Sequence, residues 1–139
     1  MNSRKRYKKS ELINFTYNIL KKVGLNNSNS KIISDLIIRA DERGVWSHGI
    51  VRLPVYINRI EKKAAKKNPN FKFKKISNNI FHLSGDNGLG YLAANAGIKK
   101  CVSLAKEKGI GLVAISKSNH FGMAANYLEF ASKNKCIAW

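Results

Sequence analysis

Three side chains with complementary chemistry, His48, Arg52 and Tyr56, follow one another four residues apart. If the segment is helical, this spacing places an imidazole, a guanidinium and a phenol on one face. Arginine can hold a carboxylate with two parallel hydrogen bonds, and histidine exchanges a proton near neutral pH. The spacing therefore favours a surface that binds anions and handles protons. The alternative is a surface helix with a chance His/Arg pair and Tyr56 as a core aromatic residue.

A second candidate histidine, His120, lies in the run Ser118-Asn119-His120-Phe121-Gly122, directly after an apolar segment. If that segment is a strand of an α/β fold, its carboxyl end is where ligands usually bind. The alternative is a loop histidine whose ring is satisfied by a backbone carbonyl. His82 lies in the middle of another expected strand and is interpreted as structural.

A third segment, Gly85-Asp86-Asn87-Gly88-Leu89-Gly90, resembles a phosphate-binding loop before a helix. Its glycine order is G-x-x-G-x-G, whereas the dinucleotide fingerprint is G-x-G-x-x-G with an acidic residue at the end of a second strand. Glu107 lies instead within the expected helix. The segment is therefore interpreted as a turn that needs glycine flexibility and caps the helix.

The elements that must position these residues follow from hydrophobic periodicity and end signals. Ser10 is a plausible N-cap for a first helix that ends at Gly24, and residues 26–30 offer a second cap cluster. Pro54 leaves the start of a third helix open, because proline fits only a first turn. The expected helices are 10–23, one that stops near Gly44, one within 47–63, 91–108 and about 123–133, and the expected strands are 71–74, 80–83, 110–116 and one from Cys136.

These elements predict an α/β fold in which a helical layer precedes a strand–helix–strand portion. We divide the chain into a basic, disordered arm (1–9), an N-terminal helical region (10–67) and an α/β region (68–139), with the break at the polar residues 66–70. The apolar strand 110–116 is expected to be covered on both faces. The chain closes within an apolar strand that runs from Cys136 to Trp139, so we expect a sequence truncated at its C-terminus.

The composition narrows the classes of function. The formal net charge of +18 permits a nucleic-acid-binding module, but no aromatic residues interleave with the lysines of residues 62–75 as a base-stacking platform requires. A solvated basic face is the preferred interpretation. No apolar run is long enough for a membrane span or a secretory signal. The two cysteines have no metal-binding or disulfide spacing, so no metal is expected and a cytoplasmic location is the default.

Three segments together resemble the type-2 malate/L-lactate dehydrogenase family. They are Ala40-Asp41-Glu42-Arg43-Gly44-Val45-Trp46-Ser47-His48-Gly49-Ile50-Val51-Arg52, Gly109-Ile110-Gly111-Leu112-Val113-Ala114-Ile115 and Ser118-Asn119-His120-Phe121-Gly122. The resemblance implies NAD or NADP as cofactor and hydride transfer between a 2-hydroxy acid and its 2-oxo acid. It also implies a homodimer and a fold other than the Rossmann domain. Family members are typically more than twice this long, so an N-terminal fragment, inactive alone, is one alternative to the enzyme.

The resemblance also assigns roles to individual residues. His120 and His48 fall on histidines with acid/base or substrate roles, and Arg52 falls on the arginine that holds the substrate carboxylate. Ser47 and Tyr56 are secondary matches for substrate binding, and His120 and Gly122 are weak candidates for cofactor binding. The resemblance implies that most nucleotide-contacting segments of the family lie beyond the position of Trp139.

Overall fold

A computed structural model describes residues 6–139, so most of the predicted basic arm (1–9) lies outside the described residues. Helix α1 (Lys9–Lys22) already includes the last residue of that arm. The predicted N-cap was wrong: Lys8 is the N-cap, no side chain caps the helix, and Ser10 lies within its first turn. Gly24 ends the helix as predicted, with a φ of +98° that disfavours other residues.

Helix α2 (Asn27–Glu42) packs against α1. Asn26 is its N-cap, and the side-chain oxygen accepts a hydrogen bond from the Asn29 backbone N–H at 2.8 Å. This cap was predicted from the cluster of Asn and Ser residues. Gly44, at a φ of +74°, follows the helix and turns the chain toward His48.

The expected helix within residues 47–63 is not continuous. Two single 3₁₀ turns, η1 (Trp46–His48) and η2 (Ile50–Arg52), precede helix α3 (Leu53–Glu61). Pro54 lies in the first turn of α3, where its missing N–H costs nothing. His48, Arg52 and Tyr56 therefore do not share the face of one helix.

The sheet has three strands in the order β1-β2-β3, namely β1 (Lys72–Lys75), β2 (Ile80–Gly88) and β3 (Leu112–Ser118). β1 pairs with β2 antiparallel, and β2 pairs with β3 parallel. The long helix α4 (Gly90–Lys108) connects the parallel pair and ends at Gly109, as predicted. The mixed α/β class predicted from the sequence is confirmed, although the strand–helix–strand unit is β2-α4-β3.

β3 is not covered on both faces as its apolar sequence suggested. It lies at the edge of the described sheet, and α4 packs on one side. Leu112, near the start of β3, is 51% exposed.

The strand expected from Cys136 to Trp139 does not form, so this prediction was wrong. After helix α5 (Ala125–Lys133), the Cys136 backbone N–H bonds to the Ala131 carbonyl at the end of that helix. The residues that follow have no regular secondary structure, and the side chains of Ile137 and Trp139 are fully exposed. β3 has an unpaired outer edge, but this run does not pair with it, because the Cys136 N–H is bonded to the end of α5.

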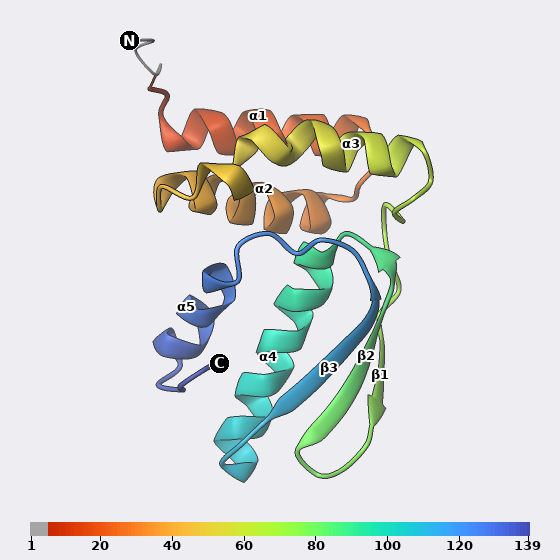
Figure 1. Ribbon diagram of the computed structural model, residues 1–139, viewed down its shortest axis with the longest axis vertical. Coiled ribbons are helices and arrows are strands. Elements are labelled where there is room, and N and C mark those ends of the chain that lie inside the picture. Colours follow the sequence, from red (N-terminus) through yellow and green to blue (C-terminus); the bar gives the residue numbers. More distant parts are fainter. Residues whose placement is uncertain (1–5) are drawn as a thin grey trace.

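Figure 1 shows α1 and α3 side by side with α2 beneath them, and this helical layer lies across an end of α4, with the sheet on one side of α4 and α5 on the other. The layer and the α/β part share one buried apolar cluster, which includes Leu20, Ile33, Ile37, Tyr56, Leu89, Tyr91 and Tyr127. The polar segment between them is also attached, because the Asn68 side chain accepts from the Asn26 N–H and donates to the Gly24 carbonyl. In the part of the chain that the structure describes, no helix has the length and apolar character of a membrane span.

Candidate functional site

The turn that carries His48 is held by a partly buried acidic contact. The Asp41 carboxylate, at the end of α2, accepts a hydrogen bond from the Ile50 backbone N–H at 2.7 Å. Gly49 permits this approach, since a Cβ at that position would overlap the Asp41 carboxylate. Burial raises the pKa of Asp41 even though the Ile50 N–H lowers it. Asp41 and Gly49 together fix the two short turns that present His48 and Arg52.

The loop that carries His120 follows β3 and packs against the end of β2. The Asn119 amide donates to the carbonyls of Asn87 and Gly88, both at 3.2 Å, and its oxygen accepts from Arg59 of α3 at 2.8 Å. A Cβ on Gly90 would overlap the Asn119 carbonyl. The loop is therefore fastened to β2, α3 and the start of α4.

His120 lies where these supports meet. Its ring centroid is 5.4 Å from that of His48, and the two rings are stacked. Its Nδ1 lies 3.0 Å from the Tyr56 hydroxyl and accepts a hydrogen bond from the Gly122 backbone N–H at 3.2 Å. Burial lowers the pKa of His120, with smaller contributions in the same direction from His48 and Arg52. His120 is therefore biased toward the neutral imidazole.

Tyr56 approaches His120 from the interior, because its side chain is only 1% exposed. Its hydroxyl also lies 3.0 Å from the hydroxyl of Tyr91, which is fully buried at the start of α4. The two phenol rings meet edge to face. Burial raises the pKa of both tyrosines, so both are protonated at neutral pH. Tyr56 thus lies on the buried side of the histidine, and its role in substrate binding stays a prediction.

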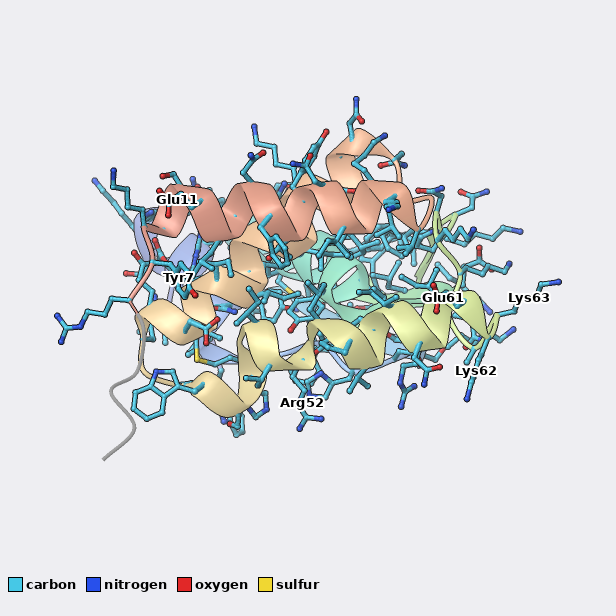
Figure 2. The ribbon with its side chains drawn as sticks, turned by 90° about the horizontal axis from the view of Figure 1, so that it is seen from above. Tyr7, Glu11, Arg52, Glu61, Lys62 and Lys63 are labelled. Atoms are coloured by element: carbon cyan, nitrogen blue, oxygen red, sulfur yellow. The ribbon has the colours of Figure 1, made fainter. Side chains whose placement is uncertain are left out.

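Arg52, the N-cap residue of α3, lies near His120. Figure 2 shows its side chain leaving the start of α3 on the side away from α1. Its Nε donates to the Ser47 carbonyl at 2.9 Å, which orients the guanidinium, and the Ser47 hydroxyl lies 2.9 Å from His48 Nδ1. The arginine is close enough to His120 to lower its pKa electrostatically. Its terminal nitrogens suit a carboxylate ligand.

The glycine-rich segment has a different role from the turn that its sequence suggested. β2 continues to Gly88, and the glycines permit close packing: a Cβ on Gly85 would crowd the Lys117 carbonyl, and one on Gly88 would crowd Pro69. The positive φ angles fall on Asp86 and Asn87 instead. The segment therefore buttresses the His120 loop.

Gly122 has a packing role as well. Its φ is +76°, and a Cβ there would overlap the Tyr91 ring. Its N–H is directed at His120 Nδ1. A cofactor contact at Gly122 stays a prediction.

Trp139 is not part of this cluster. It lines a groove near the C-terminal end of α4 together with Cys101 and Gly109. The His120 loop lies instead against Gly90, at the start of the same helix. Trp139 therefore does not contribute to the histidine site, and the nucleotide-contacting segments expected beyond it stay a prediction.

Sequence reasoning missed three residues that build this site: Asp41, Tyr91 and Asn119. Asp41 and Asn119 stood in the segments that carried the family resemblance, but nothing in their spacing indicated which backbone groups they bind. Tyr91 gave no signal, since a tyrosine at the start of an apolar helix is typical of a core position. The contact between its hydroxyl and Tyr56, 35 residues away, depends on the tertiary fold.

Other surfaces offer weaker chemistry. Among residues 6–139, no group of three His, Cys, Asp or Glu side chains is arranged to hold a metal ion. The lysines of residues 62–75 are exposed, as predicted for a solvated basic face. His82, interpreted as structural, lies in β2 with its Nε2 2.8 Å from the Ser116 hydroxyl.

Comparison with known proteins points to one family. The sequence profile of a family described as malate/L-lactate dehydrogenase matches residues 7–139. A malate/(S)-sulfolactate dehydrogenase from Methanothermus fervidus is 37% identical over 119 residues, covering 86% of this chain and 35% of that protein. A ureidoglycolate dehydrogenase (NAD(+)) from Escherichia coli K12 is 29% identical, covering 84% of this chain and 33% of that protein.

The fold agrees with solved structures of the same kind. Malate dehydrogenase from Pyrococcus horikoshii superposes with a TM-score of 0.92 at 32% identity, covering 96% of this chain and 38% of that one. The chain thus spans 35% of the length of the first curated relative. The arrangement of helices, sheet and histidine loop described above is shared with larger proteins.

Proposed function

Because the chain belongs to the malate/L-lactate dehydrogenase family, we propose that it supplies the substrate half of an NAD(P)-dependent oxidoreductase. The reaction interconverts a 2-hydroxy acid, malate-like or lactate-like, and its 2-oxo acid. One observation carries the proposal: the stacked rings of His48 and His120 lie close to Arg52. Two imidazoles and a guanidinium that can bind a carboxylate are therefore found at one site.

Residues of the chain have separate roles in this reaction. Arg52 holds the substrate carboxylate through its terminal nitrogens, while the Ser47 carbonyl accepts from its Nε and orients the guanidinium. Reduction of the ketone leaves alkoxide character on the carbonyl oxygen, which a positioned N–H hydrogen-bond donor stabilises, an effect of about 10²–10³ in rate. His120 is the first candidate for this donor and His48 the second. Tyr56 acts behind His120.

The hydride is supplied by NAD or NADP when it is bound, and the protein orients it. The E. coli relative is named for NAD(+), and a (2R)-3-sulfolactate dehydrogenase from Chromohalobacter salexigens is named for NADP(+). Within residues 6–139, the Gly85–Gly90 segment does not fit a phosphate cradle, since its glycines are packed against protein. A homodimer and a cytoplasmic location are part of the same proposal.

The proposal is tested first on the chain itself. Titration with L-malate, followed by NMR, should shift the side-chain signals of Arg52 and His120. Methyl malate esters, which lack the free carboxylates, serve as the control and should shift neither. Equal shifts with both ligands, or with neither, would contradict a carboxylate site.

Turnover is tested in a chimera. Residues 7–139 replace the matching segment of the Pyrococcus horikoshii malate dehydrogenase. Oxidation of NADH or NADPH with a 2-oxo acid is expected, and a chimera carrying Arg52→Ala is the matched control. A folded chimera with no activity on any malate-like or lactate-like 2-oxo acid would refute the proposed function.

A further inference from the structure

A line of three hydrogen-bonding groups runs from the interior to His120. The Tyr91 hydroxyl lies 3.0 Å from the Tyr56 hydroxyl, which lies 3.0 Å from His120 Nδ1. Each group comes from a different element: Tyr91 from α4, Tyr56 from α3 and His120 from the loop after β3. The two hydroxyls are enclosed, since Tyr91 is 0% exposed and Tyr56 is 1% exposed.

The direction of these hydrogen bonds is fixed by one backbone group. The Gly122 N–H can only donate, and it is directed at His120 Nδ1 at 3.2 Å. Nδ1 must therefore be the accepting nitrogen of the neutral ring, which leaves the proton on Nε2. Tyr56 can then only donate to Nδ1. Having one hydrogen, its oxygen must accept from Tyr91.

We propose that Tyr91 is a positioning residue which, through Tyr56, holds His120 as the Nε2–H tautomer and so presents an N–H donor to the substrate oxygen. The last clause rests on the proposed function, whereas the tautomer does not. Tyr91 never touches the substrate in this arrangement. It acts by committing the single hydrogen of Tyr56 to the histidine.

Packing and electrostatics agree with this assignment. The Tyr91 ring is held by Gly122, because a Cβ at that position would overlap it, so the same glycine positions both ends of the line. The lowered pKa of His120, caused first by burial, keeps the ring neutral, so only one of its nitrogens carries a proton. Protonation of Nδ1 would leave the Gly122 N–H facing another N–H. A buried donor without an acceptor is costly.

The test is the ¹⁵N NMR spectrum of the His120 ring in the labelled 139-residue chain at neutral pH, assigned with His120→Gln. The wild-type ring should show a protonated Nε2 and an unprotonated, accepting Nδ1. In Tyr91→Phe, the ratio of the Nε2–H to the Nδ1–H tautomer should fall about 2- to 10-fold, as expected for one neutral hydrogen bond. Tyr56→Phe, which removes the donor itself, should lower the ratio at least as far.

Thr16→Val is the control. Thr16 is also fully buried, at 0% exposed, but it lies in α1 and outside the line from Tyr91 to His120, and valine removes its hydroxyl at nearly the same volume. This variant should leave the His120 tautomer ratio unchanged. An equal change in Thr16→Val would mean that loss of any buried hydroxyl has the same effect, which would overturn the proposal.

Two further outcomes decide the matter without dependence on activity. A wild-type ring protonated on Nδ1, or a folded Tyr91→Phe chain with an unchanged ratio, refutes the positioning role. If Tyr91→Phe does not fold, the wild-type hydroxyl protons decide: the Tyr56 proton must show a nuclear Overhauser effect to the His120 ring, and its absence refutes the role. An inactive chimera with the tautomer intact would count only against the proposed function.

Discussion

At the residue scale, Arg52 offers a test of substrate binding. Its Nε is used by the Ser47 carbonyl, so the terminal nitrogens are its means of holding a carboxylate. In the chimera, Arg52→Lys keeps the charge but loses the planar fork, and KM for the 2-oxo acid should rise about 10- to 100-fold with little change in kcat. Steady-state kinetics measure this. Lys62→Gln, an exposed residue beyond the end of α3, is the control.

The two stacked histidines can be separated by their effect on turnover. A donor to the carbonyl oxygen acts in the transition state, so its removal lowers kcat more than it changes KM. His120→Asn in the chimera should lower kcat about 10²–10³-fold, and His48→Asn should be the milder of the two. A greater loss in His48→Asn would transfer the role to His48. Near-normal kcat in both variants would exclude either histidine as the donor.

His120 also makes the stability of the chain depend on pH. Its pKa in the folded chain lies below the ordinary value of 6.5, chiefly because of burial. The unfolded chain therefore binds a proton more readily, so this contribution to stability is present above pH 6.5 and is lost as the pH falls through the folded pKa. Urea unfolding of His120→Gln should show a smaller fall in the free energy of unfolding over this range than wild type. Parallel pH curves would contradict the depressed pKa.

At the element scale, the turn between α2 and α3 determines where His48 and Arg52 lie. Gly49→Ala forces a methyl group into the Asp41 carboxylate, so the Asp41–Ile50 contact must break. Overpacking of this kind costs about 1–3 kcal/mol. We expect this loss of unfolding free energy in urea together with displaced His48 and His120 NMR signals.

The control for this change is Gly44→Ala in the same connection. Gly44 has a φ of +74° but no neighbour within 4 Å, so the substitution adds backbone strain without a clash. It should reduce stability while leaving the His120 signals in place. Displacement of those signals by both variants would mean that the Asp41 contact is not what positions the turn.

The same turn shows how far local sequence signals reach. Three helix ends were predicted correctly, those at Gly24, Asn26 and Gly109. This was possible because capping residues and residues with positive φ act over only a few positions of the sequence. The spacing of His48, Arg52 and Tyr56 suggested one helical face, but two 3₁₀ turns lie before α3. His48 and Tyr56 both contact His120, which comes from the loop after β3, and these contacts depend on tertiary packing. Local rules could not predict it.

At the scale of the whole molecule, burial was the property least accessible from sequence. An apolar strand such as β3 indicates that both faces are covered somewhere in a protein, and it does not indicate by which residues. Within the described chain only one side of β3 is packed by α4. The strand predicted from Cys136 to Trp139 failed because apolar character does not determine whether a run pairs with an edge. The outer edge of β3 is unpaired, yet the Cys136 N–H bonds to the Ala131 carbonyl at the end of α5.

This exposure leads to a prediction about solution behaviour. Three apolar side chains in and just before the edge strand β3 are exposed: Ile110 (62%), Leu112 (51%) and Ile115 (40%). Exposed apolar side chains on an edge strand favour association between chains. The 139-residue chain should bind the dye ANS and self-associate with increasing concentration. Ile110→Lys and Leu112→Lys together should reduce both effects, because lysine on an edge strand opposes pairing. Matched changes of Lys72 and Lys74 to glutamine, on the other edge strand, should not reduce them. ANS fluorescence and sedimentation velocity measure the two effects, and a chain that stays monomeric without binding the dye would contradict the exposure of β3.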